Sequence, residues 1–146
     1  TAEERERLWT ARRAISPALK LLKPKKLNED IVVPRSRIPD ILNELGLIAA
    51  KHGLLIVNFG HAGDGNIHTN VMFDEQDRPR AETAVREIFA ATLRLGGSIS
   101  GEHGIGLSKA EYLPMELSKE AIAAMKRIKQ ALDPNNILNP GKIFLE

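Results

Sequence analysis

Two short segments of this sequence hold most of the side chains that could do chemistry. Residues 60–70 read GHAGDGNIHTN and contain His61 and His68, while residues 98–106 read SISGEHGIG and contain Glu102. Most of the chain's eleven glycines lie in or beside these segments, and glycine lets a backbone approach a ligand closely. Two imidazoles and a carboxylate would form a nitrogen and oxygen donor set suited to a divalent first-row metal.

The Asp64-Gly65 pair predicts a two-residue type I′ turn, because it lies between two strand-like runs and such a turn needs positive φ at both central residues. This register would place His61 directly opposite His68, with Cβ atoms about 4.5–5.5 Å apart. Asn70 follows His68 on the same face of the strand. A longer glycine-rich loop is the alternative, and it would loosen this pairing but leave both histidines at its mouth.

The second segment places Glu102 and His103 next to each other in sequence. In an extended backbone, neighbouring side chains point to opposite sides, so we expect these two residues to have different functions. The glycine spacing does not match a dinucleotide-binding fingerprint. Neither segment reads G-x-G-x-x-G before a helix with an acidic residue about 20 positions later. The sequence also lacks the phosphate-binding pattern G-x-x-x-x-G-K-[ST].

Composition excludes several other kinds of site. The 146 residues contain no cysteine, which excludes a disulfide framework, a zinc ribbon, an iron–sulfur cluster and a thiol nucleophile. Any metal must therefore be held by nitrogen and oxygen ligands. With 42% hydrophobic and 27% charged residues, the chain is typical of a soluble globular protein, and its length fits a single domain over residues 1–146.

Charge and hydropathy exclude some partners. The net charge is +2, and the densest basic stretch, residues 20–37, has no aromatic residue beside it, so we expect no nucleic-acid binding. No apolar run approaches the length of about 20 residues that a membrane-spanning helix needs. The sequence opens without an initiator Met or a signal peptide, so we expect it to be a piece of a longer chain.

Hydrophobic periodicity predicts the elements that must position these segments. The expected helices cover residues 3–22, 38–49, 79–95 and 118–132, and a short one follows a capping box at residues 108–111. The expected strands cover residues 30–33, 54–59 and 67–73. Ser16-Pro17 is interpreted as an N-cap and first helical position that interrupt the first helix. This order predicts an α+β fold, a mainly antiparallel sheet with helices packed on one face.

Residues 60–68 and 98–106 resemble the C-terminal domain of FAD-linked 2-hydroxyacid oxidases and dehydrogenases. This family, related to vanillyl-alcohol oxidase, includes the glycolate oxidase FAD subunit, D-lactate dehydrogenase and D-2-hydroxyglutarate dehydrogenase. The resemblance extends to residues 8–12 and 138–142, so it covers nearly the whole chain in order. It implies a ferredoxin-like cap domain of a larger polypeptide, whose N-terminal FAD-binding domain these residues do not include.

The resemblance also implies roles for individual residues. His61, His68 and Glu102 match the family's metal ligands, which typically hold zinc or another divalent ion. His103 matches the proposed general base, and Asn70 matches an amide that contacts the substrate. The spacing of these residues and the resemblance therefore indicate the same cluster.

Two further residues match the family's site for the substrate carboxylate. Arg12 matches the arginine that binds the carboxylate, and Ser16 lies where a hydroxyl residue often assists it. Some members have a lysine two residues before the first strand predicted here, but this chain has Asn28 at that position. Either Lys25 or Lys26 takes over that contact, or the substrate differs.

As a whole enzyme, the family member would oxidise a small 2-hydroxy acid of the glycolate, D-lactate or D-2-hydroxyglutarate type, with hydride transfer from Cα to FAD. Asn139 and Lys142 lie in the family's closing motif, near the flavin. The implied partners are the chain's own FAD domain and other oxidase subunits or an electron carrier. The implied location is the cytoplasm or the inner face of the membrane as a peripheral protein. The fragment alone is expected to be inactive, because it lacks the flavin site.

Two other functions stay open from the residues alone. A metal-dependent hydrolase could use the same two histidines and glutamate with a metal-bound water and no flavin. A non-catalytic domain could use the glycine-rich loops as a surface for a partner. Metal content and flavin absorbance of the full-length protein would distinguish both from a flavin-dependent dehydrogenase.

Overall fold

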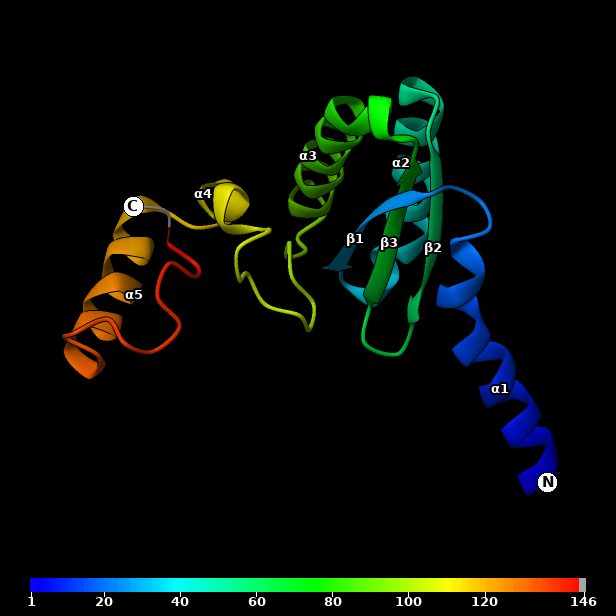
Figure 1. The fold of residues 1–146 in the computed structure, drawn as a ribbon, viewed down its shortest axis with the longest axis horizontal. Helices are drawn as coiled ribbons and strands as arrows, with labels where there is room; N and C mark the ends of the chain where they lie inside the picture. The colour runs from blue at the N-terminus through cyan, green and yellow to red at the C-terminus, as the bar shows by residue number, and fades with distance from the viewer. Residues whose placement is uncertain (145–146) are drawn as a thin grey trace.

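The computed structural model describes residues 1–144, and Figure 1 shows how the elements are arranged. Its helices are α1 (Ala2–Leu19), α2 (Ile38–His52), α3 (Arg78–Arg94), α4 (Leu113–Glu116) and α5 (Lys119–Leu132). Its strands are β1 (Lys25–Val32), β2 (Leu55–His61) and β3 (Asn66–Phe73). Short 3₁₀ turns precede α2, α3 and α4.

The sheet has β3 at its centre, antiparallel to β1 on one side and to β2 on the other. Helices α2 and α3 pack on one face, where alternate side chains of β3 such as Ile67, Val71 and Phe73 are buried. A backbone bridge between Val32 and Ser98 adds an antiparallel contact at the outer edge of β1. The expected α+β fold is confirmed, and the β-α-β-β-α order from β1 to α3 matches a ferredoxin-like β-α-β-β-α-β unit without its last strand.

The core lies between the sheet and these two helices. Helix α2 contributes Ile41, Leu45 and Ile48 at helical spacing, and α3 contributes residues such as Ile88. Gly53 ends α2 in the left-handed conformation, with φ of 58°, as the sequence predicts. Because both helices cover the same face, the opposite face of the sheet is left for polar side chains of the strands.

Helix α1 differs from its prediction at Ser16-Pro17. No new helix starts there, because α1 runs without interruption to Leu19 from a capping box at Thr1. Pro17 lies near the C-terminal end of α1, so its missing N–H removes a backbone hydrogen bond close to the end of the helix and not in its middle. Ser16 is therefore a residue of the helix surface and not a cap.

The segment before α4 also differs from its prediction. The sequence predicts a capping box at residues 108–111, but the 3₁₀ turn Ala110–Tyr112 has no side-chain cap. Lys109 precedes this turn and is only 3% exposed. The segment is therefore held by a lysine that points into the protein, an arrangement that local sequence does not reveal.

Helices α1 and α5 project away from the sheet at opposite ends of the molecule (Figure 1). Leu19 is the one buried residue of α1, and α5 has none. After α5 the chain turns back along that helix, and the backbone N–H groups of Ile137 and Leu138 donate to the carboxylate of Asp133. None of the helices in residues 1–144 combines the length and the hydropathy that a membrane span requires.

Candidate metal and substrate site

The hairpin of β2 and β3 carries two histidines, in a register that differs from the prediction. His61 pairs with Asn66 across a loop formed by residues 62–65, and His68 lies opposite Phe59. The predicted two-residue turn is therefore wrong, and the longer glycine-rich loop is the one that forms. Both histidines still occupy the same face of the hairpin, with ring centroids 5.4 Å apart.

A backbone contact with the end of β1 explains the longer loop. The N–H group of Val33 donates to the carbonyl of Gly65 at 3.1 Å. Gly65 has a φ of +76°, and a Cβ added there would lie 2.0 Å from the Val33 carbonyl oxygen. The loop conformation thus depends on a tertiary contact and on glycine, whereas the expected turn follows from the hairpin sequence alone.

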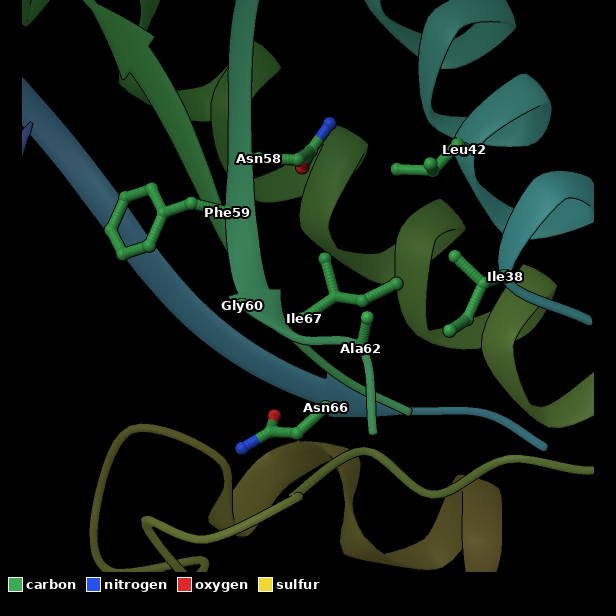
Figure 2. A pocket seen from close by; sticks show the side chains of 8 residues that line it. All are labelled: Ile38, Leu42, Asn58, Phe59, Gly60, Ala62, Asn66 and Ile67. Atoms are coloured by element: carbon green, nitrogen blue, oxygen red, sulfur yellow. The ribbon is translucent and has the colours of Figure 1, made fainter. Parts of the chain in front are cut away.

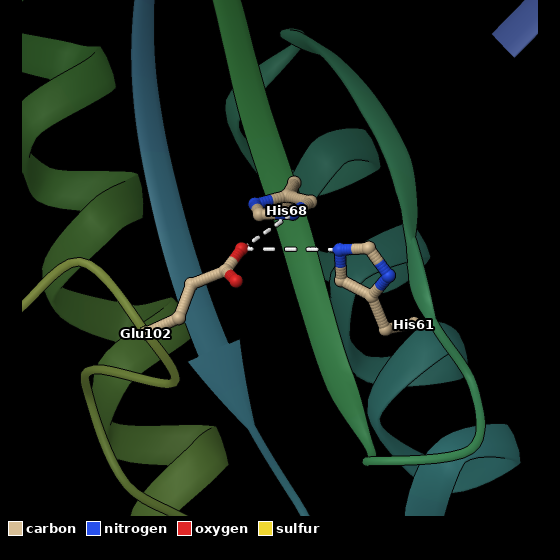
Figure 3. Close-up of side chains that lie close together, drawn as sticks. All are labelled: His61, His68 and Glu102. Carbon is tan, nitrogen blue, oxygen red and sulfur yellow. Dashed lines mark ion pairs between the residues drawn. The ribbon is translucent and has the colours of Figure 1, made fainter.

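His61, His68 and Glu102 converge on the sheet face that the helices leave open (Figure 3). Glu102 Oε1 lies 3.0 Å from His68 Nε2 and 3.9 Å from His61 Nε2, and one donor atom of each residue lies within 4.8 Å of the other two. The His68 side chain is 9% exposed, whereas the other two are about half exposed. This set of two nitrogens and one oxygen fits a divalent metal ion and leaves an open side for further ligands.

The protonation of His68 suits a donor role. Burial lowers the pKa of His68, and the Glu102 carboxylate, which raises it, does not compensate fully. His103 and His61 lower this pKa further. The His68 imidazole is therefore neutral at neutral pH, with a lone pair that can bind a metal ion.

His103 lies beside the three donors and does not point away from them. Its ring stacks on His68 with a centroid distance of 5.4 Å and an interplanar angle of 24°, and its Nε2 is 3.7 Å from Glu102 Oε1. The expectation that Glu102 and His103 point to opposite sides is wrong, because residues 101–103 form a bend and not an extended strand. His103 thus adjoins the donor set without belonging to it.

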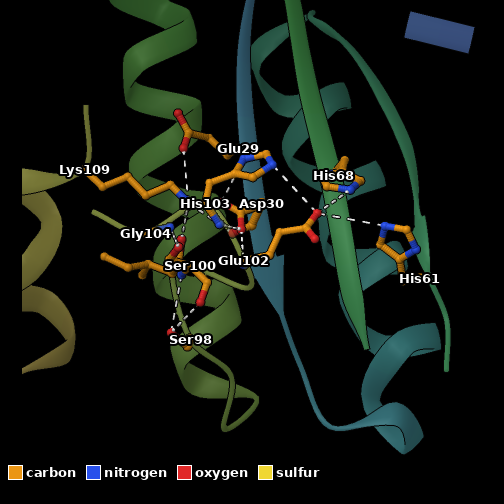
Figure 4. A network of polar contacts seen from close by, with 11 residues as sticks. Glu29, Asp30, His61, His68, Ser98, Ser100, Glu102, His103, Gly104 and Lys109 are labelled. Carbon is orange, nitrogen blue, oxygen red and sulfur yellow. Dashed lines mark hydrogen bonds and ion pairs between the residues drawn. The ribbon is translucent and has the colours of Figure 1, made fainter. Parts of the chain in front are cut away.

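Asp30 and Lys109 complete the polar cluster, and sequence reasoning missed both (Figure 4). Asp30 Oδ2 accepts the backbone N–H groups of Glu102 at 2.5 Å and His103 at 2.9 Å. Lys109 Nζ donates to Asp30 Oδ1. The available signal was the acidic residue itself, because aspartate is depleted in strands and this one lies within β1.

Asp30 is ionised at neutral pH despite its complete burial. Burial alone would raise the pKa of Asp30, but the hydrogen bonds from Glu102, Lys109 and His103 outweigh it and hold the pKa at about 2. The Lys109 ammonium stands against this carboxylate as its counter-ion. The cluster therefore contains a buried ion pair next to the solvent-open donor set.

Helix α1 brings two predicted substrate residues over the same sheet face. The guanidinium carbon of Arg12 lies 4.9 Å from the centre of the Phe59 ring, and that ring centre is 5.5 Å from the His68 ring. Ser16, one helical turn later, accepts a hydrogen bond from Lys26 at 3.3 Å. Arg12 thus borders the histidine cluster on the side of β2, whereas Ser16 lies farther along the same face, beside Lys26 of β1.

Asn70 is fully buried at the centre of the same face. It pairs with Asn28 of β1 and Val57 of β2, and its Nδ2 donates to the carbonyls of Val57 at 3.2 Å and His68 at 3.4 Å. Within residues 1–144, the Oδ1 atom of Asn70 has no hydrogen-bond partner. A buried oxygen without a partner is rare in folded proteins, so Asn70 is a candidate contact for a ligand or an ordered water.

Of the two lysines considered in place of the family lysine, Lys26 lies on the site face of β1. It lies two residues before Asn28, so both side chains are on the same face of β1, and its Nζ donates to the Ser16 hydroxyl. Lys25 instead pairs with Glu75 at 2.9 Å. Lys26 is therefore the lysine that borders the candidate substrate site.

Asn139 and Lys142 lie beside α5, in the segment that turns back along that helix and that Figure 1 shows away from the sheet. Both help to line a pocket that includes Lys126 of α5. Their segment approaches the site region through the N–H group of Ile143, which donates to the Gly106 carbonyl at 2.7 Å. In the part of the chain that the structure describes, neither residue contacts the three donors.

A separate pocket opens on the helix side of the hairpin (Figure 2). Ile38 and Leu42 of α2 face Asn58 and Ile67 across it, while the Phe59 ring points away. The residues that line this pocket include no titratable side chain. The groups capable of chemistry are therefore concentrated on the opposite face of the sheet.

Comparison with known proteins agrees with the resemblance seen in the sequence. The family model for FAD linked oxidases, C-terminal domain, matches residues 1–143. The chain is 50% identical to the glycolate oxidase subunit GlcD of Bacillus subtilis (strain 168), over 99% of the chain and 31% of that protein. It is 38% identical to the mitochondrial D-lactate dehydrogenase (cytochrome) of Arabidopsis thaliana, over 97% of the chain and 26% of that protein.

A third relative is the D-2-hydroxyglutarate dehydrogenase of Stutzerimonas stutzeri (strain A1501), which is 38% identical over 97% of the chain and 32% of that protein. The chain thus spans about a third or less of the length of these relatives. The match of the family model covers α1, the sheet, the histidine hairpin and the Glu102 segment alike. The chain therefore belongs to the family of C-terminal domains of FAD-linked oxidases.

Proposed function

We propose that this chain is the substrate- and metal-binding domain of an FAD-dependent 2-hydroxyacid dehydrogenase or oxidase. The observation that carries the proposal is the convergence of His61, His68 and Glu102 beside His103 on one open sheet face. The names of the relatives support the substrate class, since they are a glycolate oxidase subunit, a D-lactate dehydrogenase and a D-2-hydroxyglutarate dehydrogenase. Each of these acids has a hydroxyl group on the carbon next to the carboxylate.

His61, His68 and Glu102 would hold a divalent ion, which we propose to be zinc, because the set offers two imidazoles and a carboxylate. When bound, the ion would act as a Lewis acid on the substrate hydroxyl, and FAD would accept the hydride from Cα. The buried, neutral His68 gives the site a fixed ligand. The exposed sides of His61 and Glu102 leave the substrate free to approach.

His103 takes the proton of the substrate hydroxyl. Its ring stacks on His68 and its Nε2 borders Glu102, so it adjoins the volume in which a hydroxyl oxygen next to the donors would lie. Imidazole is the side chain most often used as a general base. The bend at residues 101–103 places this base and the ligand Glu102 on the same side of the chain.

Arg12 and Ser16 bind the carboxylate end of the substrate, and the amide of Asn70 contacts the substrate beside them. Arg12 is held over Phe59, and its guanidinium group can form two parallel hydrogen bonds to a carboxylate. Lys26, next to Ser16, supplies the positive charge that a lysine at position 28 supplies in some members. Binding the carboxylate at this edge would fix the orientation of the acid for hydride transfer.

The flavin is proposed to bind mainly to an N-terminal domain of the same polypeptide, with Asn139 and Lys142 near it. Two findings support this: the family of the chain, and the small share of each relative that the chain covers. That share is 31% for the Bacillus subtilis protein. Residues 1–146 would then form one domain of a larger cytoplasmic enzyme. Other oxidase subunits or an electron carrier would reoxidise the flavin.

The test is metal content and flavin reduction in the purified full-length protein. Wild type should hold zinc, and its flavin should bleach anaerobically with glycolate, D-lactate or D-2-hydroxyglutarate. His61→Ala and Glu102→Gln should each lose the zinc and slow flavin reduction by about 100-fold or more, because the metal site needs its full ligand set. His52→Ala is the matched control, since His52 lies at the end of α2 and pairs with Glu87.

The other outcomes separate the remaining functions. Zinc without flavin reduction by any of these acids would contradict the proposal and favour a metal-dependent hydrolase. A full-length protein that holds no zinc and shows no turnover would favour a non-catalytic domain. Unchanged turnover in His61→Ala and Glu102→Gln would show that the donor set plays no part in the reaction. The acid that reduces the flavin fastest would identify the substrate.

A further inference from the structure

We propose that Asp30 is the residue that positions Glu102 and His103, and that Lys109 holds Asp30 in place for this (Figure 4). Asp30 lies on β1 directly opposite His68 of β3. It is thus next to one member of the donor set in the sheet and bonded to the loop that carries another. Its role is positioning, and it does not contact the substrate.

Three consecutive backbone N–H groups of the loop donate to Asp30. The N–H of Gly101 donates to the Asp30 main-chain carbonyl at 3.1 Å, and those of Glu102 and His103 donate to Oδ2 at 2.5 and 2.9 Å. Each N–H group near the protein interior needs an acceptor, and Asp30 supplies one to all three. These bonds fix the bend at residues 101–103, and the directions of the two side chains follow from that bend.

Lys109 fixes the Asp30 carboxylate from the other side. Its Nζ donates to Asp30 Oδ1, to the Asp30 main-chain oxygen at 3.1 Å and to the Ile99 carbonyl at 2.7 Å. These acceptors satisfy all the protons of the ammonium group. Asp30 is fully buried and Lys109 is 3% exposed, so neither side chain can rotate without breaking several buried bonds.

The same carboxylate also faces the His103 ring. Asp30 Oδ1 lies 3.4 Å from His103 Nδ1, while His103 Nε2 lies on the side of Glu102, 3.7 Å from its Oε1. The ring is thus held between Asp30 and the donor set and stacks on His68. Asp30 therefore controls both the carboxylate ligand and the imidazole beside it, the two groups whose spacing the proposed reaction depends on.

Asp30→Asn tests this role with a side chain of nearly the same size. The carboxylate uses one oxygen for the loop and the other for Lys109, whereas an amide offers only one acceptor oxygen. In either orientation the amide nitrogen of the variant faces a donor. We expect the loop to loosen, so amide hydrogen exchange in the peptide with Glu102 and His103 should become about tenfold faster or more.

The effect on turnover rests on the proposed function and is measured in the full-length flavoprotein. Asp30→Asn should weaken zinc affinity by about 10–100-fold, as expected when a residue that orients a metal ligand is lost. At saturating zinc, kcat should fall about tenfold or more. The KM for the 2-hydroxy acid should change by less than about threefold, because Arg12 and Ser16 stay in place, and a merely destabilised protein would not show this split.

Glu116→Gln is the matched control. The Glu116 carboxylate accepts the backbone N–H of Ile99 at 3.0 Å, so it anchors the same loop away from Glu102 and His103. This variant should lower Tm but keep zinc affinity, kcat and exchange of the Glu102 peptide within about twofold of wild type.

Unchanged exchange, zinc affinity and kcat in Asp30→Asn would overturn the proposal. If this variant fails to fold because Lys109 is left without its counter-ion, Asp30→Asn combined with Lys109→Met removes both charges and is measured in the same way. The exchange result does not depend on metal or flavin. Faster exchange in a protein whose wild type neither binds zinc nor oxidises 2-hydroxy acids would therefore support the positioning role while rejecting the proposed function.

Discussion

Glu29 is a buried carboxyl group that the proposed chemistry does not use. It precedes Asp30 on β1, is 6% exposed, and its Oε2 has no hydrogen-bond partner among residues 1–144. The Nζ of Lys109 lies 3.7 Å from this oxygen and is already bonded to Asp30. Burial raises the pKa of Glu29 to about 7, although Lys109 opposes the shift. The free energy of unfolding must therefore depend on pH through this residue.

We expect that free energy to fall as the pH rises through the pKa of Glu29. The ordinary pKa is 4.5, so the stability from the raised pKa is fully present below about pH 4.5 and is lost as the pH passes about 7. The loss amounts to about 3 kcal/mol. Glu29→Gln should remove it, so the variant should lose less stability than wild type between about pH 5 and about pH 8 in urea unfolding.

Glu3→Gln is the control for that measurement, because Glu3 is exposed on α1 and far from Lys109 in the sequence. Its unfolding free energy should follow the wild-type pH dependence. Parallel curves for wild type and Glu29→Gln would show that Glu29 keeps an ordinary pKa in the folded protein.

At the scale of elements, the conformation of the loop between β2 and β3 depends on Gly65 more than on Gly63. Gly65 has positive φ and would bring a Cβ to 2.0 Å from the Val33 carbonyl oxygen, whereas a Cβ at Gly63 meets nothing within 4 Å. We expect Gly65→Ala to lower the free energy of unfolding by about 2–4 kcal/mol, from backbone strain plus the contact with β1. Gly63→Ala should change it by less than about 1 kcal/mol.

Urea unfolding of both variants measures this difference. The hairpin also carries His61 and His68, so Gly65→Ala should weaken zinc binding while Gly63→Ala leaves it unchanged. Equal stability of the two variants would mean that the contact between Gly65 and Val33 does not hold the loop.

The sequence predicts the elements better than their contacts. Helix α2 with its Gly53 stop, strand β3 and helix α5 with its Ser118 cap all form where periodicity and capping rules place them. The hairpin register fails because the Asp-Gly rule is local, whereas the bond between Val33 and Gly65 joins segments on either side of α2. Strand β1 begins at Lys25, well before the predicted start, because pairing with β3 extends it through polar residues.

In the candidate site too, the residue types could be predicted from the sequence, but their tertiary contacts could not. The residue types of His61, His68 and Glu102 could be read from the sequence, since glycine-rich segments with histidines are unusual in a plain scaffold. The direction of His103 could not, because it follows from a bend that Asp30 stabilises from 73 residues away. The role of Lys109 could not be predicted for the same reason, since its acceptor on Asp30 lies 79 residues away in the sequence.

At the scale of the whole molecule, the two projecting helices expose apolar side chains. Leu8 and Trp9 of α1 are 73% and 54% exposed, and Ile128 and Leu132 of α5 are 61% and 79% exposed. A helix of this length without tertiary packing is only marginally stable in water. In the proposed enzyme, the FAD-binding domain is the part of the polypeptide that could cover them.

We therefore expect the isolated 146-residue chain to have a stable centre and two weakly protected ends. Amide hydrogen exchange should be slow in β3, α2 and α3, where the buried core lies, and close to that of an unfolded peptide in α5 and the first half of α1. Trp9 is the chain's one tryptophan, so its fluorescence reports on α1 directly, and acrylamide should quench it almost as well as a free indole. Protection of α5 equal to that of β3 would contradict this expectation, because it would mean that α5 packs on the core without help from another domain.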